Sequence, residues 1–201
     1  VRGWKVGAKS PSDVPVCAPL VAGSIVGASK DAIAVGSEPI GIELEIAFRI
    51  SRDFPVGAAE PSPAEILDAV GSAHIVVELC RSRLAEGTNA PPLWLLADRQ
   101  MNHMLVLGSE IRGWRDAAFD RMSARLSVDG ALVHDAVGGY APETPLPLLI
   151  WLVRHAVRSR GGLPAGSVVT TGSWTGLRWI KPPILVQGVF APGAEIDVAL
   201  V

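Results

Sequence analysis

A run of strict alternation between Ile40 and Ser51 constrains the fold more than any other part of the sequence. Apolar side chains occupy every second position of this run, at Ile40, Ile42, Leu44, Ile46, Phe48 and Ile50. Successive side chains of a β-strand point to opposite faces of a sheet, so the pattern predicts one long strand whose apolar face lies on a core. The intervening positions, which include Glu43 and Glu45, are predicted to face away from that core.

Glycine and proline divide the rest of the chain into short segments. The 21 Gly and 16 Pro favour many strands joined by turns over a helical bundle. Asp129-Gly130 predicts the type I′ turn of a hairpin. Further strands are predicted at residues 4–7, 21–26, 75–80, 104–107, 122–128, 131–134, 168–171, 184–190 and 195–200. The sequence therefore predicts a mixed, β-rich α+β fold.

Two helices are predicted from their end signals. The first runs from Pro63 to Gly71, with Ser62 as the N-cap and Glu65 completing a capping box. The second runs from about Pro145 to Arg160, with Thr144 as the cap and two glycines at its end. Residues 85–100, which contain two glycine- or proline-rich turns, are predicted to form a loop.

Composition limits the class of protein. The 201 residues are 49% hydrophobic and 19% charged, which suits a single domain over residues 1–201 with a sizeable core. A net charge of -2 and scattered basic residues argue against nucleic acid as a partner. No apolar run approaches the roughly 20 residues that a membrane helix needs. With no secretory signal and two cysteines, Cys17 and Cys80, a cytoplasmic location is expected.

Three glutamates are the candidates for chemistry. Glu43 and Glu45 are two apart on the predicted strand, so they share a face with Cα atoms about 6.5–7 Å apart. Glu78 interrupts an apolar strand, where an unpaired carboxylate is costly. Carboxylates this close repel one another unless a cation or protons lie between them. The residues alone leave two interpretations open, a divalent-metal site or acids that face solvent and pair with arginines.

Cys80 is two residues from Glu78 and is predicted to point to the same face. A buried, inert thiol is the favoured interpretation, and a thiol that lines the pocket is the alternative.

A series of motifs, in order along nearly the whole chain, resembles the fumarylacetoacetate hydrolase superfamily, in particular its branch of 2-keto-4-pentenoate hydratases, 2-oxohept-3-enedioate hydratases and 4-oxalocrotonate decarboxylases. The matching segments are Gly3-Trp4-Lys5-Val6-Gly7, Glu43-Leu44-Glu45-Ile46-Ala47, Arg52-Asp53-Phe54-Pro55, Val77-Glu78-Leu79, Ala97-Asp98, Val106-Leu107-Gly108, Pro147-Leu148, Trp151-Leu152 and Thr171-Gly172. The resemblance implies a β-roll or β-sandwich with a few helices. It also implies a homo-oligomer.

The resemblance implies a role for each matching residue. Glu43, Glu45 and Glu78 would bind Mg²⁺ or Mn²⁺, and Lys5 would be catalytic. Thr171, Gly172 and Asp98 would contact a small 2-oxo or enol carboxylic acid. The implied reaction is the addition of water to a 2-hydroxy-2,4-dienoate in the breakdown of aromatic compounds. Decarboxylation or carbon–carbon hydrolysis of a 2-oxo acid is the alternative within the superfamily.

The sequence also departs from the family pattern. The hydratases carry an acid shortly after the lysine, where this chain has Val16-Cys17-Ala18-Pro19-Leu20. Their Asp-Asn-Ala-Ser stretch is Asp98-Arg99-Gln100-Met101 here. No counterpart of the family's helical N-terminal segment precedes Val1. The missing acid in Val16–Leu20 keeps open a third interpretation, a catalytically silent relative that binds an acid ligand or serves as a partner subunit.

Overall fold

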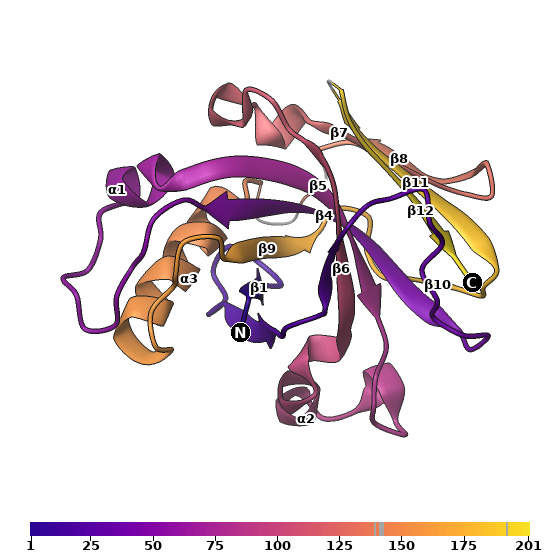
Figure 1. The fold of residues 1–201 in the computed structure, drawn as a ribbon, viewed down its shortest axis with the longest axis horizontal. Coiled ribbons are helices and arrows are strands. Elements are labelled where there is room, and N and C mark those ends of the chain that lie inside the picture. The colour runs from indigo at the N-terminus through magenta and orange to yellow at the C-terminus, as the bar shows by residue number, and fades with distance from the viewer. Residues whose placement is uncertain (139, 141–142, 192) are drawn as a thin grey trace.

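The computed structural model describes residues 1–201 except 139, 141, 142 and 192. Strands dominate the described residues, which confirms the predicted β-rich α+β fold (Figure 1). The strands are β1 (Gly3–Gly7), β2 (Val16–Leu20), β3 (Ile25–Gly27), β4 (Ile40–Ile50), β5 (Val70–Cys80), β6 (Asn102–Glu110), β7 (Ser123–Val128), β8 (Ala131–Val137), β9 (Val168–Ser173), β10 (Arg178–Ile180), β11 (Ile184–Ala191) and β12 (Ala194–Leu200). The α-helices are α1 (Pro63–Asp68), α2 (Pro92–Ala97) and α3 (Leu146–Ser159).

The larger sheet has the strand order β2-β1-β9-β4-β5-β6-β3, with β10 paired to β4. In a flat sheet its end strands would lie about 29 Å apart, at about 4.8 Å a step. The chain from Leu20 to Ile25 spans at most about 18 Å. Since so short a connection joins β2 to β3, the sheet is curled into a roll. The smaller sheet, with the order β12-β11-β7-β8, packs beside it (Figure 1).

The alternating run forms β4 as predicted, with its apolar residues on the main core. Ile42, Leu44 and Ile46 are fully buried there, together with residues of the smaller sheet and of α3. The opposite face of β4 lines the inside of the roll. A second, smaller cluster fills the roll, namely Leu20, Ala47, Val76, Leu105, Leu107 and Val168. The face that carries Glu43 and Glu45 is therefore enclosed by the same sheet.

The helix predictions are confirmed in outline and wrong in detail. Ser62 and Glu65 form the predicted capping box, but α1 ends at Asp68 because β5 begins at Val70, five residues earlier than expected. Pro145 holds the N-cap position predicted for Thr144, but the Thr144 hydroxyl still accepts a hydrogen bond from the Leu146 N–H at 3.4 Å. At its other end α3 is closed as predicted, where the Gly162 N–H donates to the Ala156 carbonyl.

The loop predicted at residues 85–100 is wrong in its second half, which forms α2. Pro91 takes the N-cap and Pro92 the first helical position, where no N–H is needed, so these prolines begin a helix instead of preventing one. Among the described residues, no helix has the length and apolarity to cross a membrane. The predicted hairpin turn is confirmed, since Asp129 and Gly130 both have positive φ.

Candidate metal centre

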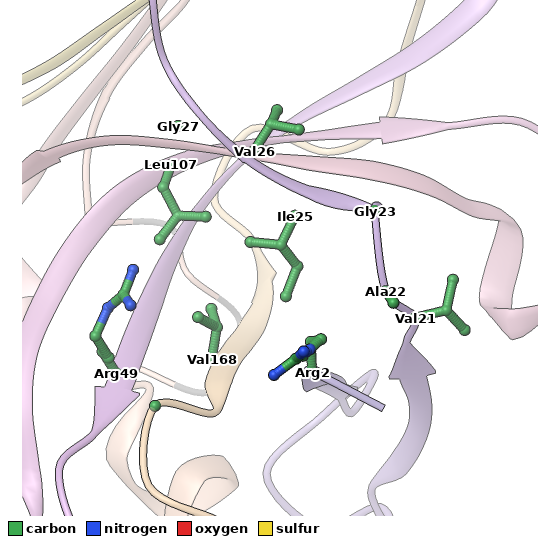
Figure 2. A pocket seen from close by; sticks show the side chains of 11 residues that line it. Arg2, Val21, Ala22, Gly23, Ile25, Val26, Gly27, Arg49, Leu107 and Val168 are labelled. Carbon is green, nitrogen blue, oxygen red and sulfur yellow. The ribbon is translucent and has the colours of Figure 1, made fainter.

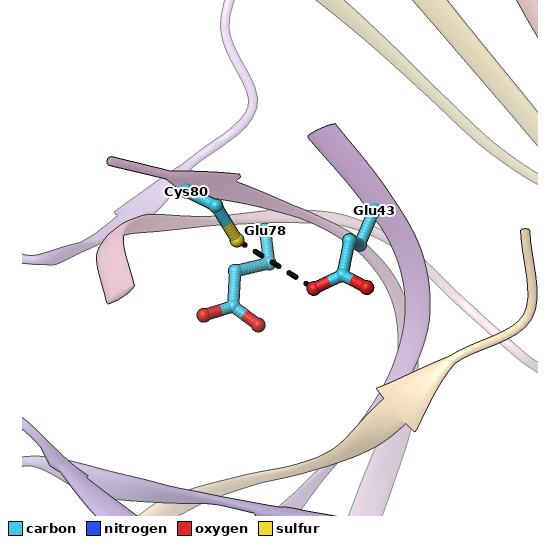
Figure 3. A group of neighbouring side chains, drawn as sticks. All are labelled: Glu43, Glu78 and Cys80. Carbon is cyan, nitrogen blue, oxygen red and sulfur yellow. Dashed lines mark hydrogen bonds between the residues drawn. The ribbon is translucent and has the colours of Figure 1, made fainter. Parts of the chain in front are cut away.

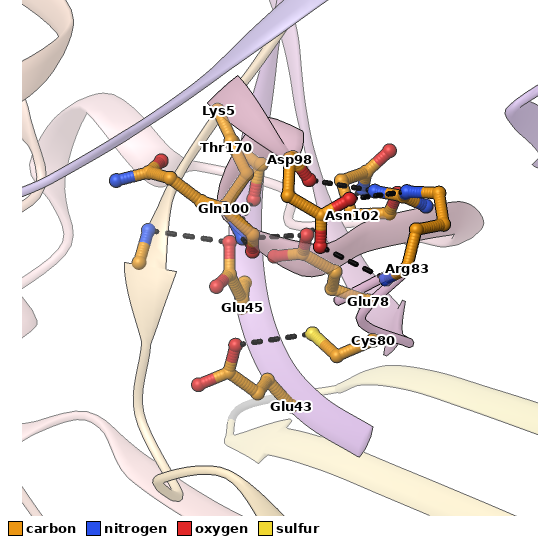
Figure 4. Close-up of polar contacts among 11 residues, drawn as sticks. Lys5, Glu43, Glu45, Glu78, Cys80, Arg83, Asp98, Gln100, Asn102 and Thr170 are labelled. Carbon is orange, nitrogen blue, oxygen red and sulfur yellow. Dashed lines mark hydrogen bonds and ion pairs between the residues drawn. The ribbon is translucent and has the colours of Figure 1, made fainter. Parts of the chain in front are cut away.

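The three predicted glutamates lie together on the inner face of the roll (Figure 4). Glu43 on β4 pairs directly with Glu78 on β5, so their side chains leave the sheet side by side. Glu45 follows two residues along β4 and shares that face. The structure thus brings together residues that are 35 positions apart in the sequence.

Glu78 is fully buried and has one occupied and one free oxygen. Its Oε1 accepts hydrogen bonds from Lys5 Nζ at 2.6 Å and from Asn102 Nδ2 at 2.8 Å. Its Oε2 is buried without a hydrogen-bond partner among the described residues. A buried carboxylate oxygen with no donor costs free energy, which a cation beside it would offset.

Glu45 is held from β9. Its side chain is 1% exposed, and its Oε2 accepts a hydrogen bond from the Thr170 hydroxyl and one at 3.2 Å from the Gly172 N–H. Gly172 has a φ of +96°, a conformation that side-chain-bearing residues rarely adopt, so glycine at this position presents its N–H to the carboxylate. Two donors therefore fix one oxygen of Glu45.

Glu43 contacts a cysteine. The Cys80 thiol, which is fully buried, donates to Glu43 Oε2 across 3.5 Å (Figure 3). One ligand atom from each of Glu43, Glu78 and Cys80 lies within 4.8 Å of the others. Glu45 is not part of this tightest group.

Burial and mutual repulsion govern the charges of the site. Burial raises the pKa of Glu45 well above its ordinary value, and the charges of Glu78 and Glu43 raise it further. Burial, followed by the charge of Glu78, also raises the pKa of Glu43. Burial alone would lower the pKa of Lys5, but Glu78 and the other nearby acids outweigh it and raise that pKa. Lys5 is therefore an ammonium ion.

The donor set fits a divalent cation. Three carboxylates and the Lys5 ammonium leave two negative charges uncompensated, which one divalent ion would neutralise. Carboxylate oxygens are the ligands that Mg²⁺ and Mn²⁺ prefer. The unpartnered Glu78 Oε2 is the atom whose environment most requires such an ion.

Two of the predicted substrate contacts point elsewhere. The Thr171 hydroxyl donates to the Ile46 carbonyl at 3.0 Å, whereas the neighbouring Thr170 faces the acids. The Asp98 carboxylate accepts hydrogen bonds from Arg83, with which it forms an ion pair, and from the Ser82 hydroxyl at 3.0 Å. Substrate binding by Thr171 and Asp98 stays a prediction. The contacts of Asp98 with Arg83 and Ser82 also give it a structural role.

That role is to hold the segment that follows α2. Arg99, Gln100 and Met101 all have positive φ, which is unfavourable for residues with side chains. The strained turn places the Gln100 carbonyl 3.2 Å from Lys5 Nζ, where it accepts a second hydrogen bond. The side chain of Arg83 spans the turn by donating to the carbonyls of Asp98 at 2.6 Å and Asn102 at 3.0 Å.

Replacing Asp98 by Asn is expected to lower the free energy of unfolding by about 1–3 kcal/mol at pH 7, since charge-assisted hydrogen bonds are lost. Burial alone would raise the pKa of Asp98, but the hydrogen bonds from Arg83 and Ser82 bring it below the ordinary value. A lowered folded-state pKa gives stability that is present above the ordinary aspartate pKa and is lost as the pH falls through the folded-state value.

Urea unfolding between pH 7 and pH 3 measures the difference in free energy of unfolding between the natural chain and Asp98→Asn. This difference in free energy should shrink below about pH 4. A difference that does not depend on pH would contradict a role for the charge, and the exposed Asp197→Asn serves as the matched control.

Two cavities lie near the roll but differ in their relation to the acids. One, of about 340 Å³, is lined by Gln100 and Met101 of the strained turn together with Lys9, Val16, Pro92, Leu93, Leu95 and Leu96. It therefore adjoins Lys5 through Gln100. The other, of about 420 Å³, lies between Arg2 and Arg49 (Figure 2). Arg49 is four residues along β4 from Glu45, about 13 Å away, and neither the three glutamates nor Lys5 lines this cavity, so it is separate from the acid site.

The sequence did not identify Asn102, Thr170 or the Gln100 carbonyl as parts of the site. Asn102 reaches Glu78 because a register shift between Leu79 and Cys80 alters the pairing of β5 with β6. Thr170 reaches Glu45 through the pairing of β9 with β4. No local signal marks these residues, because each depends on which strands pair and in what register.

Known structures with a similar fold include three enzymes. The chain superimposes on 4-oxalocrotonate decarboxylase from Pseudomonas putida G7, solved with calcium and acetate, with a TM-score of 0.82 and 16% identity over 100% of this chain and 78% of that one. Fumarylpyruvate hydrolase from Pseudomonas aeruginosa, solved with Mn²⁺ and pyruvate, superimposes with a TM-score of 0.66 and 16% identity over 100% of this chain and 89% of that one. The 2-hydroxyhepta-2,4-diene-1,7-dioate isomerase from Mycobacterium marinum superimposes with a TM-score of 0.66 and 19% identity over 98% of this chain and 73% of that one.

The sequence matches none of the curated proteins. Residues 6–200 match the model of the fumarylacetoacetate hydrolase C-terminal family, so the match extends over nearly all of the two sheets and includes the three glutamates. The chain therefore belongs to the fumarylacetoacetate hydrolase C-terminal family.

Proposed function

We propose that this chain is a divalent-metal-dependent enzyme of small 2-oxo or enol carboxylic acids, with Glu43, Glu45 and Glu78 as ligands of Mg²⁺ or Mn²⁺. The observation that carries the proposal is a cluster of three carboxylates, fully buried at Glu45 and Glu78 and partly buried at Glu43. Among the described residues, only the Lys5 ammonium forms an ion pair with this cluster, and Glu78 Oε2 has no hydrogen-bond partner. Residues 1–201 act in this proposal as one catalytic domain, in the cytoplasm and as a homo-oligomer.

A divalent ion held by Glu43, Glu45 and Glu78 would supply Lewis acidity toward the oxygens of a 2-oxo acid. Mg²⁺ usually takes few carboxylates and keeps several waters, so ligand positions remain for a substrate carboxylate and its 2-oxo oxygen. The fumarylpyruvate hydrolase structure contains Mn²⁺ with pyruvate, a 2-oxo acid, and a 4-oxalocrotonate decarboxylase structure contains magnesium with adipate. These ligands support the proposed class of substrate.

Lys5 is the proposed proton donor. Its Nζ is oriented by Glu78 Oε1 at 2.6 Å and by the Gln100 carbonyl at 3.2 Å, and its side chain is 12% exposed. A positioned ammonium can deliver a proton to carbon as the enol returns to the 2-oxo form. Water addition to a 2-hydroxy-2,4-dienoate, which gives a 4-hydroxy-2-oxo acid, is the first proposed reaction.

Decarboxylation of a 2-oxo acid is the second candidate. Water addition needs a group that activates water as well as one that protonates carbon, whereas decarboxylation needs only protonation after CO₂ has left. The strand β2, which pairs with β1 beside Lys5, carries no acid, and Ala18 stands opposite Lys5. This arrangement favours a reaction with a single proton donor.

The test begins with Mn²⁺ binding, measured by calorimetry with and without oxalate as a mimic of a 2-oxo acid. We expect the natural chain and the exposed control Glu195→Gln to bind Mn²⁺, oxalate to tighten the binding, and Glu45→Gln to bind at least about tenfold more weakly. Binding neither to Mn²⁺ alone nor with oxalate would refute the proposed metal site.

Substrate assays then separate the reactions. With dienoate and oxalocrotonate substrates, water addition supports the hydratase and CO₂ release the decarboxylase. Cleavage of an acylpyruvate supports a carbon–carbon hydrolase. Metal and oxalate binding without turnover of any of these substrates supports a silent acid-binding relative or a partner subunit, and contradicts the proposed activity.

A further inference from the structure

Cys80 adds a sulfur donor to the carboxylate site. Its Sγ lies 3.5 Å from Glu43 Oε2, and one ligand atom each of Glu43, Glu78 and Cys80 falls within 4.8 Å of the other two. Ligand atoms that share one ion through bonds of about 2.0–2.3 Å lie about 3–4 Å apart. The three side chains therefore need only small movements to bind one ion together (Figure 3).

The sheet fixes the thiol in this position. Cys80 is two residues from Glu78 on β5, so both side chains leave the strand on the same face. The residue paired with Cys80 on β4 is Gly41, which places no side chain beside the thiol. Cys80 is also fully buried, so its sulfur stays with the acids and away from solvent.

The third predicted ligand, Glu45, lies outside the closest group of donor atoms. Both donors that reach Glu45, the Thr170 hydroxyl and the Gly172 N–H, bind the same oxygen and turn that carboxylate toward β9. Glu78 also has both of its donors on one oxygen, and its buried Oε2 has no hydrogen-bond partner among the described residues and belongs to the residue two positions from the thiol. The donors best arranged for one ion are thus two carboxylates and one sulfur.

We propose that Cys80 is a metal ligand in this chain, beside Glu43 and Glu78, so that the site accepts thiophilic divalent cations such as Zn²⁺, Co²⁺ and Cd²⁺ in addition to Mg²⁺ or Mn²⁺. The inference rests on the proposed metal site. When such an ion binds, the S–H bond breaks, the sulfur gives its electron pair to the ion, and the proton leaves to solvent. A soft thiolate ligand raises affinity for these ions far more than for Mn²⁺.

The test is a titration of the whole chain with Co²⁺ and Cd²⁺. Its readout is the ultraviolet absorption band of thiolate-to-metal charge transfer. The chain has two cysteines, and Cys17 pairs with Val6 on the face of the sheet opposite Lys5. The band should appear at one equivalent of metal in the natural chain and in Cys17→Ser, and should be absent in Cys80→Ser. Cys80→Ser should bind Cd²⁺ at least about tenfold more weakly while Mn²⁺ binding changes less than about threefold.

Each other outcome has a defined meaning. If Mn²⁺ binds but Co²⁺ and Cd²⁺ give no charge-transfer band, the sulfur ligand is refuted and the carboxylate site stands. If the band disappears in Cys17→Ser, the sulfur is not that of Cys80. If none of the ions binds, the proposed metal site and this inference both fail. The Cys17→Ser arm gives its answer even if Cys80→Ser does not fold, which circular dichroism checks.

Discussion

Replacing Lys5 by Met is expected to lower the rate of the chemical step by about 10²–10⁴-fold, because the proposed proton donor is removed. The same change is expected to lower the free energy of unfolding without metal by about 3–5 kcal/mol, since it leaves a buried carboxylate without its partner. Saturating Mn²⁺ should restore about 2.7 kcal/mol at 100 times the dissociation constant. Turnover and thermal unfolding, each with and without Mn²⁺, measure the three effects.

Lys181→Met is the matched control, because this exposed lysine has no partner among the described residues. It should change neither turnover nor the response to Mn²⁺. A Lys5→Met chain that retains full turnover would show that Lys5 is not the proton donor. A chain whose stability is unchanged without metal would show that the ion pair with Glu78 has little energetic weight.

Replacing Glu78 by Gln is expected to weaken Mn²⁺ binding at least about 100-fold. Loss of a residue that merely supports a ligand costs about 10–100-fold in metal affinity, so loss of a ligand should meet or exceed the upper end. The amide oxygen can still accept from Lys5 and Asn102, so both hydrogen bonds can remain while the free anionic oxygen is removed. The increase in melting temperature with added Mn²⁺ measures the effect.

For Glu78→Gln we expect no increase in melting temperature at a Mn²⁺ concentration that stabilises the natural chain. Glu195→Gln removes one exposed carboxylate and should respond like the natural chain. Equal stabilisation of Glu78→Gln and the natural chain would exclude Glu78 as a ligand, and would direct attention to Glu43 and Glu45.

The sequence predicted the strand that carries the site, because local alternation determines it. Ile42, Leu44 and Ile46 alternate with Glu43 and Glu45, and a strand places these two sets on opposite faces wherever it lies. The capping box of Ser62 and Glu65 was predictable for the same reason, since its hydrogen bonds join residues three apart. The residues alone left open whether Glu78 joins Glu43 and Glu45 at a metal site, and the family resemblance favoured that interpretation, because pairing between strands has no local signal.

What the sequence missed depends on tertiary context. Asp98 forms an ion pair with Arg83 at the turn after α2, and no pattern in the sequence predicts this pairing. The positive φ angles of Arg99, Gln100 and Met101 contradict local preference, so only the surrounding contacts can maintain them. The contact between Cys80 and Glu43 was beyond prediction for a similar reason, because it required the register of β4 on β5.

The strained turn after α2 separates the orientation of Lys5 from the lining of the neighbouring cavity. Lys5 is oriented by the main-chain carbonyl of Gln100, and Gln100 is also one of the residues that line the neighbouring cavity of about 340 Å³. Substitution at position 100 therefore alters the walls of that cavity without removing an acceptor from the ammonium. In the proposed enzyme, a library confined to residue 100 would test whether this cavity holds the distal end of the substrate, because Lys5 and the three glutamates stay unchanged. In evolutionary terms, the proposed function would let one codon, that of residue 100, alter the preferred substrate while Lys5 and the three glutamates stay unchanged.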